Sequence, residues 1–563
     1  MKKIISILSI SLVFSTSCDF LEEDNKSGIS NDDLYSTAVG YETLMTAAYA
    51  SLKTVYGETP WLILGGTDIY QKGRNTDHQG MYDYQLYPSD PDVTSFYKKC
   101  YSAIQTVNMA LFYNEAPVDI NDGRRAMYAA ELRFLRAFYH FLLLEQFGSI
   151  VISKDATRTP ITSMSRQPLD ECYKFIIAEI EGILPQLGAE KGRVTKDAAN
   201  HFLAKIYLTR GWDFNSPADF AKAKEYAQTV ISSRGAITLT YADLWRHDNE
   251  DNSEVIFTVQ YDLKSIASRT EGNSQQSLYC SHLGGQETFQ KQGATQLIPA
   301  WNLLMWFEEN DTRYFSIFMT TVYETYFDYY TVDDKSTLKV RAWYPRVWGR
   351  SERREYSADS VAFVNSHTLT DNPIKNYYPF LENEESYRAN INQDFNTCPV
   401  MKFDSPVSGD VRADRASVRD IVLARLAETY FLYAEACIGQ NDYTTAAQYV
   451  QKVLDRPGNT TSGTLTNAVQ EAINGGTPTQ QEVLHGYLKE SAKEFLGEYN
   501  GRWNELRRTR MLKYMLERYN YDVKKLGINN FDFDHKYNLR PIPEEAINLN
   551  DGITLDDQNP GYK

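Results

Sequence analysis

The sequence is poor in cysteine and histidine, with six cysteines and eight histidines among 563 residues. Apart from Cys18, the cysteines stand far apart and never form a Cys-x-x-Cys pair, which argues against a disulfide scaffold and a cysteine-rich zinc site. The histidines are scattered, and none belongs to a His-Glu-x-x-His motif. We therefore expect no metal ion and no other cofactor, and we interpret the remaining cysteines as buried thiols.

The chain also lacks the short motifs of common catalytic sites. It contains no Gly-x-Ser-x-Gly elbow, no phosphate loop and no dinucleotide-binding glycine fingerprint. A glycosidase needs two carboxylates across a sugar cleft, but among 74 acidic residues no pair stands out. The acidic run at 248–252 lacks the glycine and terminal glutamate of an EF-hand loop, so we interpret it as a solvated turn. We expect a protein that is not an enzyme.

Long apolar runs are equally scarce. The run Ile4–Phe14 follows two lysines and is too short to cross a bilayer, and no second run of this kind follows. Small residues lead from it to Cys18, and acidic residues come directly after. This layout resembles a bacterial lipoprotein signal and predicts a signal peptide at 1–17, lipidation of Cys18 and a flexible tether at 18–33. The alternative is an ordinary signal peptide with an incidental cysteine.

Charge and composition narrow the classes of partner. The formal net charge is −16, which argues against binding to nucleic acid and to anionic polymers. With 42% hydrophobic and 23% charged residues, the chain is globular and long enough for a large core. It also carries 40 tyrosines, 26 phenylalanines and 8 tryptophans, and many of these aromatic residues cluster in segments with a loop-like pattern.

Helical periodicity is strongest at Arg124–Phe147, where apolar residues form two stripes. A helix with two apolar faces packs on both sides, as in a helical solenoid. The pattern predicts a mainly α fold with helical repeats at about 34–56, 96–235 and 412–520. The individual helices expected are 33–55, 96–113, 124–147, 169–187, 195–211, 218–233, 415–439, 444–455 and 479–519.

Two segments interrupt this periodicity. Residues 57–95 mix glycine, aspartate and tyrosine without a period and are expected to form a long functional loop. Residues 236–411 are rich in tryptophan and tyrosine and are expected to combine loops with a few strands. Because helical segments flank both, we predict one domain over 34–563 with these segments as its binding portion.

An internal repeat supports the solenoid. The sequence Asp-Phe-x-x-Ala-x-x-Tyr at 219–226 matches Asp-Tyr-x-x-Ala-x-x-Tyr at 442–449. Each copy follows a helix that ends in glycine, Gly211 or Gly439. In tetratricopeptide repeats, small alanines let two helices approach and the aromatic residue fills the groove between them.

Four short segments of charged, aromatic and proline residues stand out along the chain. They are AELRFLRAFY at 130–139, RLAETY at 425–430, EFLGE at 494–498 with RWNELRR at 502–508, and PIPEE at 541–545 with QNPGY at 558–562. In order and spacing, and together with the lipoprotein-like start, these segments resemble the SusD/RagB family of outer-membrane lipoproteins from Bacteroidetes.

The resemblance implies a tetratricopeptide-like solenoid with a loop-rich, minor-β portion that holds the ligand. It implies a protein that captures a polysaccharide or oligosaccharide and delivers it to a SusC-like TonB-dependent transporter. The expected location is the outer membrane, with a lipid anchor and the protein facing the cell exterior. The helical half of family members typically meets the transporter, and a minority of members handle peptides.

Several charged residues of these motifs lie on otherwise apolar helices. Buried charges must be paired, so we interpret them as ion pairs between helices rather than as ligand-binding groups. The closing segment at 558–562 is interpreted as a C-terminal staple. The charged residues concerned are Glu131, Arg133, Glu428, Glu435, Arg502 and Arg507.

A neutral sugar needs aromatic faces for stacking and planar polar side chains for paired hydrogen bonds. The loop at 57–95 contains both, and its place between the first helices matches where the family carries part of its glycan site. A second aromatic-rich tract lies at 279–348, where Trp306 is expected in the core. The expected ligand-binding residues are Arg74, Asn75, Asp77, His78 and Tyr82 in the loop, and Tyr279, Trp301 and Trp343 in the tract.

Two other functions remain open. A peptide-capturing or scaffold lipoprotein of the same family would carry a groove of hydrogen-bonding groups without coplanar aromatic faces. A surface hydrolase would require two opposed carboxylates beside the aromatic row. The abundance of loop tyrosine and tryptophan favours glycan binding.

Overall fold

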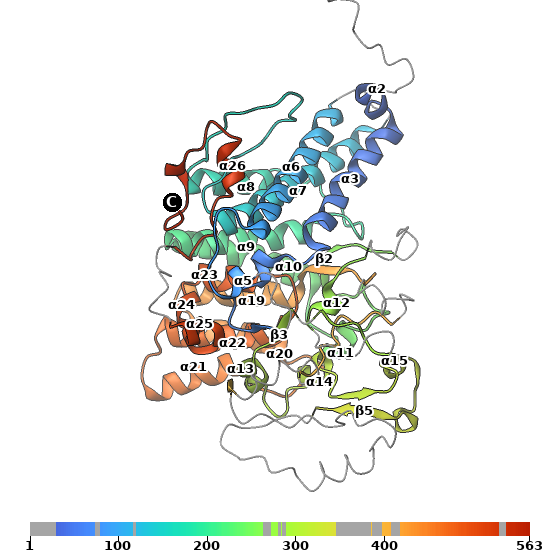
Figure 1. The fold of residues 1–563 in the computed structure, drawn as a ribbon, viewed down its shortest axis with the longest axis vertical. Helices are drawn as coiled ribbons and strands as arrows, with labels where there is room; N and C mark the ends of the chain where they lie inside the picture. Colours follow the sequence, from blue (N-terminus) through green and yellow to red (C-terminus); the bar gives the residue numbers. More distant parts are fainter. Residues whose placement is uncertain are drawn as a thin grey trace, which may run out of the picture.

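The fold is mainly helical, as predicted (Figure 1). Long helices fill the upper part of the view in Figure 1, and the loop-rich segment after α10 lies at the lower end. No helix within the described residues is long and apolar enough to span a bilayer. The computed structural model describes residues 30–73, 79–115, 120–262, 272–279, 283, 289–294, 296–344, 384–385, 397–406, 417–527 and 536–563.

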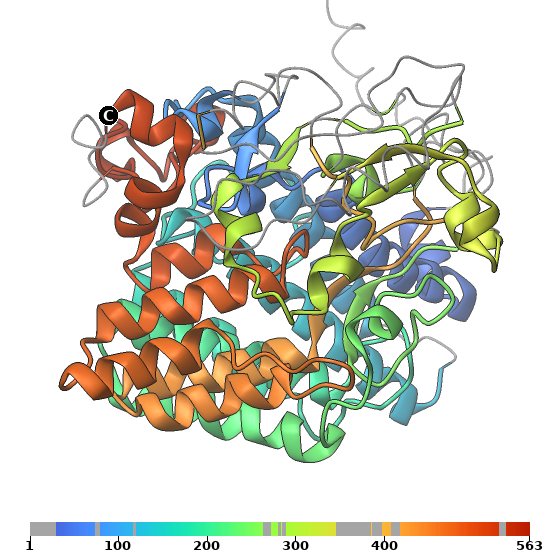
Figure 2. The ribbon, with the colours of Figure 1, turned by 90° about the horizontal axis from the view of Figure 1, so that it is seen from below.

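Neighbouring helices pack in pairs, α6 against α7, α9 against α10 and α19 against α20. Contacts between α10 and α19 join two of these pairs into one stack, seen from below in Figure 2. The helices of this part are α2 (Asn31–Tyr35), α3 (Ala38–Tyr56), α6 (Pro91–Asn114), α7 (Asp122–Phe147), α8 (Leu169–Glu181), α9 (Lys196–Phe214), α10 (Pro217–Arg234), α19 (Leu426–Gly439), α20 (Tyr443–Leu454), α21 (Thr464–Gly475), α22 (Gln480–Glu494), α23 (Arg502–Arg508), α24 (Leu512–Tyr519), α25 (Tyr521–Leu526) and α26 (Glu544–Asn548).

The remaining elements are short and belong to the loop-rich portion. Its strands form three two-stranded antiparallel sheets, β1 with β3, β2 with β6 and β4 with β5. The strands are β1 (Tyr70–Lys72), β2 (Val255–Val259), β3 (Leu297–Pro299), β4 (Thr321–Tyr323), β5 (Val340–Trp343) and β6 (Ile421–Arg425). The helices are α4 (Trp61–Leu64), α5 (Gln79–Tyr82), α11 (Tyr241–Leu244), α12 (Gln275–Leu278), α13 (Trp301–Trp306), α14 (Arg313–Ile317) and α15 (Asp328–Thr331).

The repeat read from the sequence is confirmed as two matching helix pairs. Tyr226 on α10 stacks on Tyr207 of α9 with ring centroids 5.7 Å apart, and Tyr449 on α20 stacks on Tyr433 of α19 at 3.8 Å. The alanine of each copy is completely buried between the helices. The two copies therefore use the same aromatic contact to hold their helix pair together.

Phe220 fills the space that two glycines leave open. A Cβ built on Gly211 would lie 2.8 Å from the Phe220 ring, and one built on Gly439 would lie 2.6 Å from it. The ring thus lies where α9, α10 and α19 meet, and a side chain at either glycine would overlap with it. This contact explains the glycine at both positions. Gly439 ends α19 as expected, but Gly211 lies within the last turn of α9, which continues to Phe214.

Two helix predictions need correction, and one helix was not expected. Residues 421–425 of the helix expected at 415–439 form strand β6, because Ile421 and Val422 are β-branched and pair with the similar strand β2. The helix expected at 479–519 is broken after Glu494, since Gly497 and Gly501 adopt φ angles of 78° and 89°, which a helix excludes. Helix α21 was not expected, because its sequence is mostly polar.

The interpretation of the motif charges as ion pairs is confirmed, but two of the partners, Arg193 and Asp68, lie outside the helices. Each charge has an opposite partner on another segment of the chain, with nitrogen to oxygen distances between 2.5 and 3.3 Å. The pairs are Glu131 with Arg193, Arg133 with Glu179, Glu428 with Lys205, Glu435 with Arg508, Arg502 with Asp68, and Arg507 with Asp213.

The C-terminal staple is also present. The amide of Gln558 accepts the N–H of Ile542 at 2.7 Å and donates to its carbonyl at 2.8 Å. The amide of Asn559 donates to the carbonyls of Phe147 and Arg540. The chain end is thereby fixed to the end of α7. The described cysteines Cys100, Cys172, Cys398 and Cys437 are buried free thiols, as expected.

A network of buried charges joins the helices to the loop-rich portion. Its side chains are at most 4% exposed, and consecutive oppositely charged atoms lie 2.5 to 3.7 Å apart. Five cations face five anions, so the network is neutral as a whole. Its members are Arg313, Lys402, Arg425, Arg456 and Lys493, with Glu254, Asp311, Glu490, Glu494 and Glu498.

Glu494 on α22 lies at the centre of this network. Its carboxylate contacts Arg425 at 2.9 Å, Arg313 at 3.0 Å and Arg456 at 3.2 Å. Burial opposes ionisation of Glu494, but the three arginines outweigh it and lower the pKa of its carboxyl from 4.5 to about 2. Burial lowers the pKa of the Lys402 ammonium to about 8.

Replacing Glu494 by glutamine tests the network. Glu494→Gln leaves three buried arginines without their shared carboxylate, so we expect the free energy of unfolding to fall by about 3–5 kcal/mol. Because the folded pKa is depressed, Glu494 stabilises the fold above pH 4.5, and this contribution is lost between pH 4.5 and about 2. The variant should therefore lose stability less steeply than the wild type over that range in urea unfolding. The exposed pair of Glu171 with Lys174 provides the control, where Glu171→Gln should cost less than about 0.5 kcal/mol. Equal losses in the two variants would contradict the role of the network.

Replacing Gly439 by alanine tests the contact with Phe220. The new methyl group overlaps with a buried ring, so Gly439→Ala should lower the free energy of unfolding by about 1–3 kcal/mol. Gly475 also ends a helix, but a Cβ there meets nothing within 4 Å. Gly475→Ala should be neutral or stabilising by up to about 1 kcal/mol. Chemical denaturation of both variants measures the difference, and similar values would refute the packing account.

Candidate functional site

Pairing of β1 with β3 brings the two predicted binding segments together. Tyr70, Gln71 and Lys72 lie opposite Pro299, Ile298 and Leu297. The first strand ends just before residue 74, and the second leads directly into Trp301 at the start of α13. The loop at 57–95 and the tract at 279–348 therefore meet at one edge, near β3 in Figure 1.

Side-chain contacts hold this junction in place. Lys72 and Asp83 form an ion pair at 3.3 Å across the segment between β1 and the end of α5. The hydroxyl of Tyr82 donates to the carbonyl of Gln296 at 2.6 Å, next to β3. Both contacts fix the ends of the segment that holds the predicted residues Arg74, Asn75, Asp77 and His78, which lie outside the described residues.

Tyr82 and Tyr279 belong to the floor of the site. Each side chain is 1% exposed, so neither ring offers an open face for stacking in this structure. Tyr82 packs edge-on against Trp61, and the hydroxyl of Tyr279 donates to the carbonyl of Gly497 at 3.1 Å. The sequence shows that these residues are aromatic and lie in segments without long helical periodicity, but it does not show that these segments fold inward. Tyr82 is the last residue of the short helix α5. Trp306, expected in the core, is buried.

Trp301 is the predicted aromatic residue best placed to meet a ligand at this edge. Its side chain is half-buried and packs against Ile298 of β3. The amide of the adjacent Asn302 donates to Glu384 at 3.2 Å, and Glu384 also pairs with Lys524. Burial raises the pKa of the Glu384 carboxyl, and Lys524 opposes this shift. An indole face can stack on a sugar ring, and amide and carboxylate groups can bind its hydroxyl groups.

Trp343 lies apart from this edge. It ends β5 and pairs with Thr321 of β4, in a separate sheet that Figure 1 shows towards the lower right. The structure therefore does not bring Trp343 and Trp301 together through strand pairing. Its half-buried ring remains a predicted contact for a ligand that extends beyond β3.

Gln71 is a polar residue of the junction that sequence reasoning missed. It is 1% exposed, and neither atom of its amide group has a hydrogen-bond partner among the described residues. A buried amide without hydrogen-bond partners lowers the stability of the fold by about 1–3 kcal/mol, so we expect water or a ligand to supply these hydrogen bonds. No motif marks Gln71, and only its place on β1 reveals this feature.

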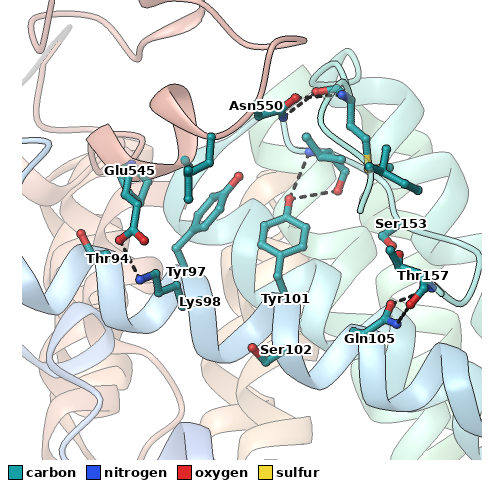
Figure 3. A pocket seen from close by; sticks show the side chains of 16 residues that line it. Thr94, Tyr97, Lys98, Tyr101, Ser102, Gln105, Ser153, Thr157, Glu545 and Asn550 are labelled. Carbon is teal, nitrogen blue, oxygen red and sulfur yellow. Dashed lines mark hydrogen bonds and ion pairs between the residues drawn. The ribbon is translucent and has the colours of Figure 1, made fainter. Parts of the chain in front are cut away.

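A second concave surface lies at the opposite end of the molecule, between α6, the segment 151–164 and α26 (Figure 3). Its volume is about 430 Å³. Tyr97 and Tyr101 point into it from α6, with ring centroids 4.7 Å apart and planes tilted by 50°. Ile161 and Leu549 line it and are 57% and 69% exposed. We call this surface the α6–α26 groove.

Four polar side chains of the α6–α26 groove, those of Lys98, Gln105, Glu545 and Asn550, are already engaged. Gln105 exchanges two hydrogen bonds with the backbone of Thr157, and Asn550 does the same with Met164 (Figure 3). Lys98 and Glu545 pair at 2.7 Å. The groove therefore presents mainly apolar surface and no coplanar aromatic platform.

The acidic run at 248–252 forms a turn. Arg246 pairs with Asp243 and Asp248, and Glu250 pairs with Arg419 at 2.9 Å. Within the described parts of the chain, no three side chains of histidine, cysteine, aspartate or glutamate gather as they would around a metal ion.

Two family profiles match the chain. One, described as the SusD family, matches residues 253–562, and another, described as starch-binding associating with outer membrane, matches residues 19–208. Together the two matches leave residues 1–18, 209–252 and 563 uncovered.

Similar proteins are known from Bacteroides. The starch-binding protein SusD of Bacteroides thetaiotaomicron is 24% identical over 469 residues, which are 80% of this chain and 76% of that protein. A SusD-like protein of Bacteroides ovatus is 23% identical over 278 residues, 46% of this chain and about half (50%) of that protein. Among solved structures, a laminarin-binding SusD-like protein aligns with a TM-score of 0.62 and 19% identity, covering 93% of this chain and 100% of the other. This structural likeness concerns the fold alone.

Proposed function

The chain belongs to the SusD family, and from this premise we propose that it is a cell-surface glycan-binding protein. It captures an oligosaccharide or polysaccharide and delivers it to a SusC-like TonB-dependent transporter in the outer membrane. Starch binding and laminarin binding by two similar proteins support this class of ligand. We propose that the protein binds glycan without cleaving it.

One observation carries the proposal, namely that β1 and β3 bring both predicted binding segments to one edge. Trp301 packs on β3 there, and the adjacent Asn302 bonds to Glu384. The ends of the segment with Arg74, Asn75, Asp77 and His78 lie at the same junction. Aromatic and planar polar groups in one place match the apolar face and hydroxyl rim of a neutral sugar. Tyr82 and Tyr279 support this edge from below.

The α6–α26 groove favours a second function, the capture of a peptide. Its exposed Ile161 and Leu549 can receive apolar side chains, and its tilted tyrosine pair does not form a sugar platform. We place it second because both side-chain amides that line it, those of Gln105 and Asn550, are bonded to the backbone of the protein and are not available to a peptide backbone.

Replacing Trp301 tests the glycan site. Isothermal titration of residues 19–563 with starch and laminarin oligosaccharides, other neutral glycans and a peptide digest should show binding to a glycan. Trp301→Ala should weaken that binding about tenfold or more, because about 1.4 kcal/mol of stacking energy corresponds to a factor of ten. Phe112→Ala, at an exposed aromatic residue on α6 away from this edge, is the control and should leave the affinity unchanged. Unchanged affinity in Trp301→Ala would remove this edge from the site, and heat from the peptides alone would favour the second function.

The lipid anchor has a separate test. We propose that Cys18 carries the lipid that holds the protein on the outer membrane, facing the exterior. A single acyl chain binds membranes only marginally, so stable anchoring requires more than one chain on this cysteine. Cys18→Ala should therefore move the protein from the membrane fraction to the soluble fraction. Cys100→Ala, at a buried thiol, should leave the distribution unchanged, and membrane retention of Cys18→Ala would contradict the proposal.

A further inference from the structure

A basic pocket opens where α23 turns into α24, at the left of Figure 1 and away from β5. Its volume is about 350 Å³. The C-terminal end of α9 and the segment before Leu539 complete its wall. The residues that line it are Asp213, Arg507, Arg508, Arg510, Leu512, Lys513 and Asn538.

Three arginines and one lysine gather in this pocket around a single lining carboxylate, in a chain whose net charge is −16. Asp213 pairs with Arg507 at 3.3 Å, and Glu435, behind the pocket, pairs with Arg508 at 2.7 Å. Arg510 donates to the neutral carbonyl of Trp212 at 3.1 Å. Glu145 and Glu505 also act on Arg507 and Arg508, whereas Arg510 has no carboxylate partner among the described residues and brings a charge that is not directly paired.

Two of the arginines also have incomplete hydrogen bonding. The side chains of Arg507 and Arg508 are 9% and 4% exposed. The Nε and Nη2 atoms of Arg507 and the Nη1 atom of Arg508 have no hydrogen-bond partner among the described residues. Leaving a buried charged donor unsatisfied costs free energy, whereas an oxyanion can accept from a guanidinium fork through two parallel hydrogen bonds.

The lining selects against a neutral sugar. No aromatic ring belongs to it among the described residues, and Leu512 is its apolar member. A sugar face would find nothing to stack on here, while a compact anion would find charge and donors.

We propose that this pocket binds a tetrahedral oxyanion, phosphate or sulfate, either as the free ion or as an ester group on a sugar. The proposal is independent of the neutral glycan site, because it concerns different residues and a different chemistry. A protein with both sites could hold an esterified glycan at two places.

The test is isothermal titration of residues 19–563 with sodium sulfate and sodium phosphate, with ionic strength held constant by sodium chloride. Melting temperature is not a suitable readout, because sulfate and phosphate stabilise many proteins through exclusion from their surface. We expect saturable binding to at least one ion. Arg510→Ala should weaken it at least fivefold, and Arg507→Lys should weaken it by loss of the guanidinium fork. Arg246→Ala, at an exposed arginine of another surface, should change it less than twofold.

Glucose 6-phosphate, with glucose as its control, distinguishes the two sources of the anion. Tighter binding of glucose 6-phosphate than of phosphate identifies a sugar ester, and equal or weaker binding identifies the free ion. Absence of saturable heat with both ions would overturn the proposal. Equal weakening by Arg246→Ala and Arg510→Ala would also overturn it, since it would indicate a general charge effect.

Discussion

The structure depends on one electrostatic constraint, the neutral network of ten buried charges around Glu494. A buried charge is tolerated only with a partner, so the segments that contribute these side chains must meet in one arrangement. The network connects α22 to β2, to the junction of β6 and α19, and to the start of α14. It is thus the point where the helical stack and the loop-rich portion are locked together.

The candidate site is built outward from this network. Directly after Glu494 the chain turns at Gly497, whose N–H donates to the hydroxyl of Tyr70 and whose carbonyl accepts from Tyr279. Tyr70 begins β1, which pairs with β3 and so positions Trp301. The aromatic residues next to the network therefore connect it to the binding edge. This explains why some aromatic residues of the loops are buried, although their composition resembles that of a sugar site.

The helical fold could be predicted because its signals are local. The two stripes of α7, the repeated Ala and Tyr positions of α10 and α20, and the charges of the motifs all lie within single helices. Strand β6 could not be predicted, because it depends on pairing with the distant strand β2. The break at Gly497 could not be predicted either, because it depends on the ring of Phe403, which would lie 2.3 Å from a Cβ built on that glycine. The site was predicted in part. Trp301 could be predicted because it belongs to an aromatic-rich tract. Gln71, Asn302 and Glu384 could be recognised as candidate site residues only after the structure placed β1 and α13 relative to each other.

Hydrogen exchange of residues 19–563, with and without a saturating glycan, tests most directly where the ligand binds. Bound glycan should slow exchange in peptides that cover 79–83 and 296–306, because ordering of this edge suppresses its local opening. Peptides from the α6–α26 groove, at 157–164 and 545–550, should exchange at an unchanged rate. Protection confined to the groove, with none at the β1–β3 edge, would contradict the account.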